Sequence, residues 1–494
     1  MASPATQAPA GDLDAGMAPA PPHVMFIPSA GMGHLLPFFR VIAALSGGHG
    51  DVDVDVSVVT VLPTVSAAEA DHLAGLFAAF PRVRRVDFHL LPFDASGEFP
   101  GHDPFLLRWE ALRRSAHLLG LLIAGAAPRV SAVVTDVTLA SHVIPIAREL
   151  RVPCHVLFVS CATMLSLLAY VPVHLDKQKE AGLLGAGVGD VDIPGVRRVP
   201  QSCLPQPLLD LNHLFTKQFI DNGREITKAD GFLVNTFDAL EPVALAALRD
   251  GKVVPGFPPV YAIGPLKSHV PTAAAEGGEK EAAAAASSPV AWLGEQPARS
   301  VVYIAFGNRN AVSRDQLREI AAGLEASGCR FLWVLKTTTV DRDDDAELAG
   351  VLGEGYLERV AGRGVVTKAW VEQEALLRHP AVGLFLSHSG WNSVTEAAAA
   401  GVPLLAWPRG GDHRVNATVV ASGGVGVWME HWSWDGEDRL VSGEEIGAKV
   451  KEVMADAAVR ARAAKVGEEA AKAVAEGGTS YWSMQEFVAK LKAT

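Results

Sequence analysis

The chain has 494 residues and a formal net charge of −12, from 43 Lys and Arg residues against 55 Asp and Glu residues. A chain of this length is too long to fold around one ordinary hydrophobic core, so we predict two domains. So acidic a chain is a poor partner for nucleic acid or an anionic membrane. The four cysteines form no CxxC pair, which argues against a disulfide framework or a zinc site and favours a reducing, cytoplasmic compartment.

Two segments could be mistaken for a secretory signal or a membrane span. Residues 1–22 are rich in Ala and Pro and contain no Lys or Arg, so we predict a disordered tail rather than a secretory signal. The apolar run at 156–173 is close in length to a membrane span. Ser and Thr residues interrupt it and Pro172 lies at its end. We therefore expect a buried strand followed by a buried helix, with no stable membrane insertion.

From residue 23, short β-rich runs alternate with amphipathic helical runs, a pattern typical of parallel α/β sheets. Residues 23–265 are predicted to form an N-terminal doubly wound domain. Its expected strands lie at 24–28, 56–61, 86–90, 132–135, 154–157 and 231–234, and its first helices at 34–45 and 66–79.

Residues 266–289 have the Ala-, Gly- and Ser-rich composition of a linker. The strand–helix alternation then restarts over 290–478, with a helix expected at 314–327. Strands are expected at 300–306, 331–334, 364–367, 382–386 and 404–407. We expect two doubly wound domains that face each other across a cleft, with ligands bound beyond the carboxyl ends of the strands.

The strongest motif in the chain runs from Trp370 to His413 and suits a nucleotide sugar. A predicted strand ends at His388, and a predicted helix begins at Trp391. The N–H groups and the dipole of a helix N-terminus favour a diphosphate. Glu396 lies on that helix, where its carboxylate can accept two ribose hydroxyls, and Trp370 can stack on a flat base.

This stretch resembles the signature box of plant family-1 UDP-sugar glycosyltransferases, through its HSGWNS sequence at 388–393, Glu396 and its GVP turn at 401–403. The resemblance extends over most of the chain. It implies an α/β GT-B fold of two Rossmann-like doubly wound domains, with the UDP-sugar held mainly by the C-terminal one. It also implies that a C-terminal helix at 479–494 packs back on the N-terminal domain.

The resemblance assigns a role to each position of the box. Trp370 would stack on uracil, Gln373 would hold the edge of that base, and Glu396 would hold the ribose. The diphosphate would contact His388, Asn392 and Ser393, the sugar would contact Trp391, Asp412 and His413, and the remaining donor-site positions would be Gly33, Asn308, Val371 and Gly390.

His34 follows the first predicted strand, where a histidine is well placed to act as a general base near neutral pH. Asp136 follows a later strand of the same predicted sheet and could orient the imidazole, as in hydrolase triads. The family's GH motif and its Asp match both positions. A helix-capping histidine and an ordinary loop carboxylate are the alternatives. No DxD pair follows a strand in the C-terminal half, so we expect neither a metal nor another cofactor beside the UDP-glucose co-substrate.

The chain departs from most of its family at 305–308, which reads AFGN, and at 370–373, which reads WVEQ. These variants resemble the C-glycosylating branch that acts on flavonoids and dihydrochalcones. On that branch His34 would ionise a phenol, and the ring carbon ortho to the oxygen would become the nucleophile. The box ends in His413 rather than Gln, which leaves galactose open as the sugar, although glucose is expected.

The acceptor pocket should be apolar with few polar anchors. Candidate lining residues are Phe93, Phe105, Trp109 and Met164, for each of which core packing is at least as good an explanation. We predict a monomeric, inverting C-glucosyltransferase of phenolics such as 2-hydroxyflavanones and the dihydrochalcone phloretin. An O-glucosyltransferase and a non-catalytic phenolic-binding protein are the alternatives. A general base and a complete donor box argue against the binding protein.

Overall fold

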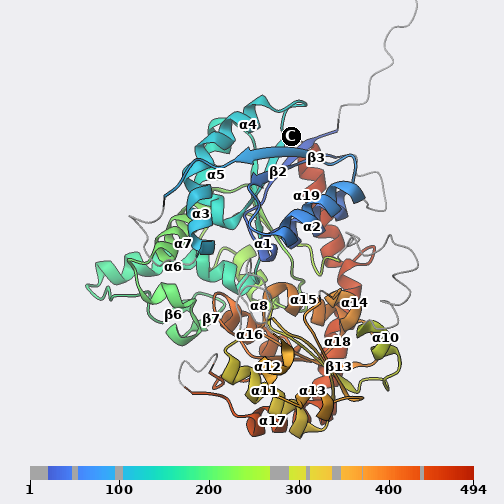
Figure 1. Ribbon diagram of the computed structural model, residues 1–494. Helices are drawn as coiled ribbons and strands as arrows, with labels where there is room; N and C mark the ends of the chain where they lie inside the picture. The colour runs from blue at the N-terminus through green and yellow to red at the C-terminus, as the bar shows by residue number, and fades with distance from the viewer. Residues whose placement is uncertain are drawn as a thin grey trace, which may run out of the picture.

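The protein is described by a computed structural model. It covers residues 21–46, 54–94, 104–267, 289–307, 312–336, 347–369, 371–433 and 439–493. Almost all of the predicted tail and of the predicted linker lies outside these ranges. The described residues form two parallel sheets, one above the other in Figure 1, each flanked by helices.

The N-terminal sheet has seven parallel strands in the order β3-β2-β1-β4-β5-β8-β9. Their bounds are β1 His23–Ile27, β2 Asp55–Leu62, β3 Arg84–His89, β4 Ala132–Asp136, β5 Cys154–Phe158, β8 Gly231–Val234 and β9 Val260–Ala262. The central strands are apolar on both faces because helices cover both sides of the sheet. Each predicted strand of this half lies within two residues of an observed one.

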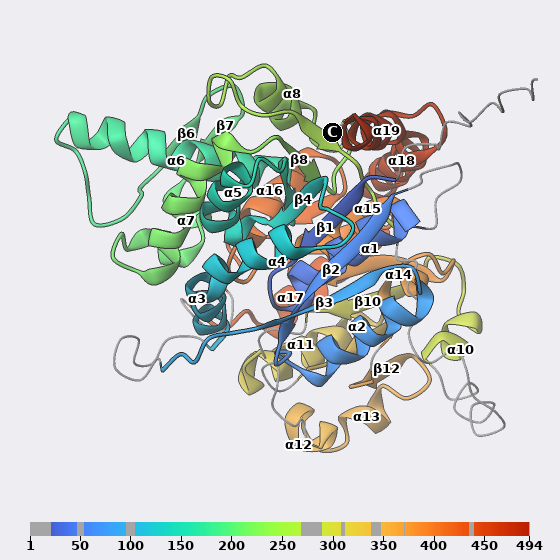
Figure 2. The same cartoon turned by 90° about the horizontal axis from the view of Figure 1, so that it is seen from above.

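Alternate residues of β1 show how the two faces are covered. Val24 and Phe26 pack with the helices at 32–46 and 67–79, whereas Met25 and Ile27 pack with the helices at 119–125 and 140–149. The helices of this half are α1 Met32–Ser46, α2 Ala67–Ala79, α3 Pro104–Ser115, α4 Leu119–Gly125, α5 Ala140–Glu149, α6 Ala162–Glu180, α7 Leu214–Glu225 and α8 Pro242–Arg249. A small antiparallel hairpin, β6 Val191–Ile193 and β7 Arg197–Val199, lies with α6 on the side of the molecule opposite α10 Pro289–Gly294 (Figure 2).

The C-terminal sheet has six parallel strands in the order β12-β11-β10-β13-β14-β15. Their bounds are β10 Val301–Ala305, β11 Arg330–Val334, β12 Gly364–Thr367, β13 Val382–Ser387, β14 Leu404–Ala406 and β15 Gly426–Trp428. The remaining helices are α11 Arg314–Ser327, α12 Leu348–Leu352, α13 Tyr356–Arg359, α14 Gln373–Leu377, α15 Trp391–Ala400, α16 His413–Ser422, α17 Gly443–Ala455, α18 Ala457–Val474 and α19 Thr479–Lys492.

The strand orders explain where a ligand can bind. In the first sheet the chain order reverses between β1 and β4, and in the second between β10 and β13. Loops leave such a reversal in opposite directions and open a crevice at the carboxyl ends of the strands. Asp136 and His388 stand at the ends of β4 and β13 respectively. The predicted α/β GT-B architecture is confirmed.

The apolar segment at 156–173 folds as the end of β5 and most of the buried helix α6. Its apolar character therefore reflects burial inside the protein, where α6 packs against α7, α8 and α16. None of the described helices combines the length and the apolar character that crossing a bilayer requires.

The last helix, α19, packs on the N-terminal sheet beside β9 (Figure 1). Phe487 is fully buried there, in one apolar cluster with Val24 and Tyr261. The ring of Phe487 meets His155 edge-on, at 5.1 Å between the centroids. Burial lowers the pKa of His155 to about 4, so this imidazole stays neutral in the folded protein near neutral pH.

Removal of the Phe487 side chain should destabilise the docked helix. We expect Phe487→Ala to lower the free energy of unfolding by about 3–5 kcal/mol, because it leaves a cavity in the core. Urea denaturation followed by circular dichroism measures this change. Trp482→Ala is the control, because the Trp482 side chain is 60% exposed on the same helix. Equal losses in the two variants would contradict a docking role for Phe487.

Candidate active site

His34 owes its position to the turn that follows β1. Gly31 in this turn has φ of 97°, a conformation that favours glycine. The Gly31 carbonyl accepts hydrogen bonds from the backbone N–H groups of His34 and Leu35, each at 3.0 Å, and so begins α1. The turn therefore places His34 in the first turn of α1, at the carboxyl edge of the sheet.

A hydrogen bond joins His34 to Asp136 across the reversal between β1 and β4. His34 Nδ1 lies 2.8 Å from Asp136 Oδ2, and Asp136 is fully buried. The other carboxylate oxygen accepts from the backbone N–H of Thr138 at 2.8 Å and from its hydroxyl at 2.7 Å. Because an ionised carboxylate only accepts, Nδ1 of the neutral imidazole carries the hydrogen, and Nε2 is the nitrogen that can take a proton.

Aromatic side chains lie beside this pair. The Trp109 ring on α3 meets the His34 ring edge-on, with 5.1 Å between the centroids. The ring centroid of Phe215 on α7 lies 6.4 Å from that of Trp109, and the ring centroid of Phe219 lies 5.9 Å from that of Phe215. Sequence reasoning proposed Trp109 and missed the two phenylalanines, although their spacing of four on one helix was a signal.

The other acceptor candidates lie in different surroundings. Met164 is buried near the start of α6, where its backbone N–H donates to Cys161 Sγ. The Phe93 ring stacks under the Arg114 guanidinium at 4.6 Å. The side chain of Phe105 lies outside the described residues. The structure therefore brings Trp109, among these four, into direct contact with His34.

On the facing sheet, β13 leads through Ser389 into α15. Ser389 has φ of 68°, and the Asn416 side-chain amide donates to its carbonyl at 3.1 Å. An added Cβ at Gly390 or Gly307 would lie 2.5 or 2.8 Å from His388 Nε2. Only glycine lets the backbone approach the imidazole this closely on both sides. Together these contacts hold the His388 ring next to the N-terminus of α15.

His388 is neutral in the folded protein. Burial, reinforced by the neighbouring His413 at 4.7 Å between ring centroids, lowers the pKa of His388 to about 3. A neutral imidazole carries a single N–H, and the Ala305 backbone already accepts a hydrogen bond from this ring. An anion at this position would therefore be attracted mainly by the positive end of the α15 dipole.

Glu396, Gln373 and Ser393 form one hydrogen-bonded cluster. Gln373 Nε2 donates to Glu396 Oε2 at 2.6 Å and to Ser393 Oγ at 3.0 Å. Tyr303 donates its hydroxyl to Gln373 Oε1 at 3.2 Å. The other oxygen of Glu396 accepts from Arg40 of α1, which the sequence analysis did not single out.

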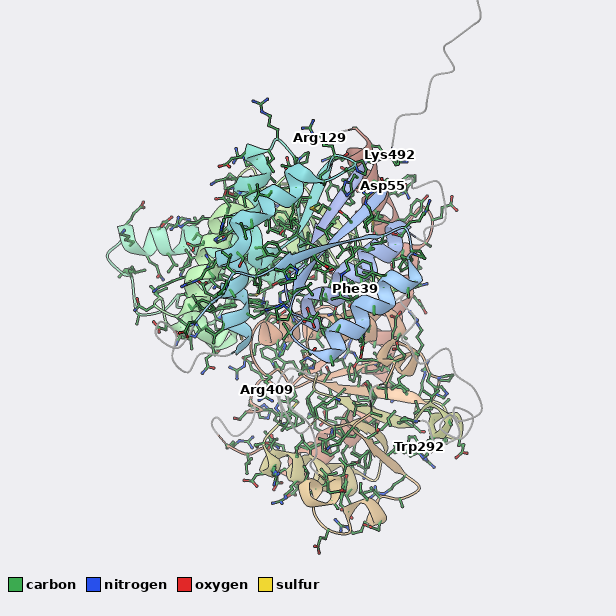
Figure 3. All side chains as sticks on the ribbon, turned by 45° about the horizontal axis from the view of Figure 1, so that its top comes forward. Phe39, Asp55, Arg129, Trp292, Arg409 and Lys492 are labelled. Atoms are coloured by element: carbon green, nitrogen blue, oxygen red, sulfur yellow. The ribbon has the colours of Figure 1, made fainter. Side chains whose placement is uncertain are left out.

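Asp412 and Trp391 also bind across the boundary between the two halves. Ser160, which follows β5, donates its hydroxyl to Asp412. The Trp391 indole N–H donates to the Asn235 carbonyl at 2.9 Å, so this side chain faces the N-terminal domain. Figure 3 shows Arg409, which follows β14, close to the same boundary.

Of the four remaining predicted donor positions, the structure describes Gly33 and Val371. The Gly33 carbonyl accepts from the Asn392 side chain at 3.4 Å. Val371 packs as a partly buried residue against the main core. Trp370 and Asn308 lie outside the described residues. Among the side chains that the structure describes, no group of three or more His, Cys, Asp and Glu could hold a metal ion.

Comparison with known proteins identifies the family. The family model for UDP-glucoronosyl and UDP-glucosyl transferase matches residues 264–463. The UDP-glycosyltransferase CGT of Oryza sativa subsp. indica is 60% identical over 466 residues, which are 94% of this chain and 95% of that protein. The chain belongs to the UDP-glycosyltransferase family. It is therefore a glycosyltransferase, and the resemblance predicted from the box is confirmed.

Solved structures agree with this assignment. The crystal structure of LpCGTa in complex with UDP has a TM-score of 0.81 and 45% identity, and the match covers 96% of this chain and 99% of that one. Phytolacca americana UGT2, solved with UDP-2fluoro-glucose and pterostilbene, has a TM-score of 0.77 and 28% identity. That match covers 95% of this glycosyltransferase and 100% of the other chain.

The lowered pKa of His388 has a consequence for stability. The unfolded chain takes up a proton on this ring near its ordinary pKa of 6.5, whereas the folded protein does so only near 3. The stabilisation from the neutral ring is therefore complete above about pH 6.5 and is lost as the pH falls towards 3. We expect the gap in free energy of unfolding between wild type and His388→Asn to narrow from about pH 7 to about pH 4. Urea titrations at each pH measure the gap, and a constant gap would contradict a buried neutral imidazole.

Proposed function

We propose that this glycosyltransferase is an inverting C-glucosyltransferase that moves glucose from UDP-glucose to a phenolic acceptor, with His34 as general base. The observation that carries the proposal is the 2.8 Å hydrogen bond between His34 Nδ1 and the fully buried Asp136. This bond leaves Nε2 to accept a proton and places a negative charge where the imidazolium forms. Acceptor classes that fit are 2-hydroxyflavanones and dihydrochalcones such as phloretin.

The reaction runs as one displacement. His34 Nε2 takes the proton of a phenol, and the phenolate spreads its charge onto the ring carbon ortho to the oxygen. That carbon attacks the anomeric carbon from the side opposite UDP, and the bond to the diphosphate oxygen breaks with its electron pair. The ring carbon then loses its hydrogen as a proton, which restores aromaticity. The N-terminus of α15, next to His388, stabilises the leaving diphosphate without requiring a metal.

The donor contacts are proposed from the family's motif. Glu396 would accept the ribose hydroxyls, Trp370 and Gln373 would hold uracil, and Asp412 and His413 would contact the sugar. His388, Asn392 and Ser393 would bind the diphosphate at the start of α15, Trp391 would also contact the sugar, and Gly33, Asn308, Val371 and Gly390 would be the remaining donor-site positions. The hydrogen bonds that join Gln373, Ser393 and Glu396 support a single preorganised site.

Two observations support a phenolic acceptor and a C–C bond. Trp109 lies against His34, at the position where an acceptor ring would rest beside the base. The rice relative carries the designation CGT, for C-glycosyltransferase, at 60% identity. O-glucosylation is the alternative reaction, because it would use the same base and the same donor site. The structure of the Phytolacca enzyme with pterostilbene fits either reaction.

Incubation with UDP-glucose and phloretin tests the bond that forms. We expect a glucoside that survives hot acid and fragments across the sugar ring in mass spectrometry, because a C–C bond does not hydrolyse. Release of intact glucose would establish an O-glucosyltransferase instead. No product with either UDP-glucose or UDP-galactose, despite binding of phloretin, would contradict phloretin as an acceptor.

Substitution of the two proposed catalytic residues tests the base. We expect His34→Ala to abolish transfer and Asp136→Asn to lower kcat by about 10²–10⁴, because the imidazole loses its orientation and its countercharge. UDP binding, measured by calorimetry, should survive in both variants. His117→Ala is the control, because it removes an exposed histidine of the same domain. A nearly normal rate in His34→Ala would remove His34 from the base role.

A further inference from the structure

Arg40 is a buried cation at the boundary between the two domains. Its side chain is 5% exposed, and Nη2 donates to Glu396 Oε1, whose side chain is 8% exposed. Nη1 lies 3.5 Å from Asn392 Oδ1. Both partners belong to the proposed donor box of the C-terminal domain, whereas Arg40 belongs to α1 of the N-terminal domain. The acceptor domain therefore contributes a charge to the donor side of the cleft.

The contacts of Arg40 are part of a longer connection between α1 and α15. Asn392 and Glu396 are four residues apart on α15, so they lie on one face of this helix, and both contact Arg40 of α1. The Asn392 amide reaches the Gly33 carbonyl at 3.4 Å, next to His34. Arg40 lies six residues further along α1, about 9 Å at 1.5 Å per residue. Helix α1 thus carries the proposed base, His34, in its first turn and the cation that contacts Glu396, Arg40, near its middle.

The hydrogen bonds at Glu396 leave room for a ribose. An ionised carboxylate has about four acceptor positions, two on each oxygen. Gln373 occupies one on Oε2, and Arg40 occupies one on Oε1. One position on each oxygen remains, which matches the two hydroxyls of a ribose. Without Arg40, this carboxylate would be buried with no countercharge and without the contact that orients Oε1.

We propose that Arg40 is a positioning residue for the donor. It holds the Glu396 carboxylate in the orientation that accepts both ribose hydroxyls, and it makes donor affinity depend on a residue of the acceptor domain. This inference rests on the proposed donor site, in which Glu396 binds the ribose. It distinguishes Arg40 from a structural ion pair, because the loss on substitution must depend on the hydroxyls of the nucleotide.

Calorimetric binding of UDP and of 2′,3′-dideoxy-UDP to the full chain tests this role. We expect Arg40→Met to weaken UDP binding by about tenfold or more, since hydrogen bonds to a charged group are lost from their aligned geometry. Binding of the dideoxy nucleotide should change by less than about twofold. Arg40→Lys should recover part of the UDP affinity, because lysine keeps the charge and lacks the guanidinium fork. Arg249→Met is the matched control, since Arg249 pairs with Asp238 inside the N-terminal domain.

A double-mutant cycle separates this proposal from the donor assignment on which it rests. In a Glu396→Gln background, Arg40→Met should cause no further loss of UDP affinity. Unchanged UDP affinity in Arg40→Met, or equal weakening of both nucleotides, would overturn the role of Arg40 while leaving the donor site standing. UDP affinity unaffected by Glu396→Gln would overturn the donor assignment and the proposal together. If Arg40→Met fails to fold, as judged by its melting temperature, the ratio of the two affinities in Arg40→Lys decides the question.

Discussion

Parallel pairing of β1 with β4 is the constraint on which the acceptor side of the site depends. Ile27 lies opposite Thr135 in this pairing, so the next residues along both strands leave the same edge of the sheet. The chain turns at Gly31 into α1, and Asp136 ends β4, which brings the imidazole of His34 against a fully buried carboxylate. The second oxygen of Asp136 is occupied by Thr138. A slip of one residue in this register would turn Asp136 to the other face and separate the pair.

The donor side repeats the same geometry with different chemistry. The reversal between β10 and β13 places the N-terminus of α15 at the carboxyl edge of the sheet, and glycines on both sides let the backbone approach His388 closely. Burial keeps that imidazole neutral, and the Ala305 backbone accepts a hydrogen bond from it, so His388 brings no positive charge to this end of α15. In the proposed reaction, a diphosphate that gains charge as it leaves would be stabilised mainly by the helix dipole and by N–H groups that are already oriented.

Polar contacts join the two domains at their boundary. Arg40 meets Glu396, Ser160 meets Asp412, and the Trp391 indole meets the Asn235 carbonyl. Buried polar groups of this kind require their partners, because an unpaired charge or N–H in a protein interior is costly. The relative position of the domains is therefore coupled to residues of the proposed site, and α19 adds an apolar contact from the end of the chain to the N-terminal sheet.

The amino-acid sequence by itself determined the strand–helix alternation, the α/β class and the box from Trp370 to His413, because periodicity and motif spacing are local properties. It missed β6, β7, β9 and β15, which have three residues each and are too short to show a period, whereas the equally short β14 was predicted because it follows the helix of the box. It also passed over Arg40, although this is the one charged residue in the apolar run from Leu35 to Leu45. Only the tertiary structure decided that Arg40 meets Glu396, that Trp109 lies against His34, and that Trp391 turns towards the other domain. Each of these contacts joins residues far apart in the chain, and their proximity follows from how the sheets and helices pack, which no local pattern encodes.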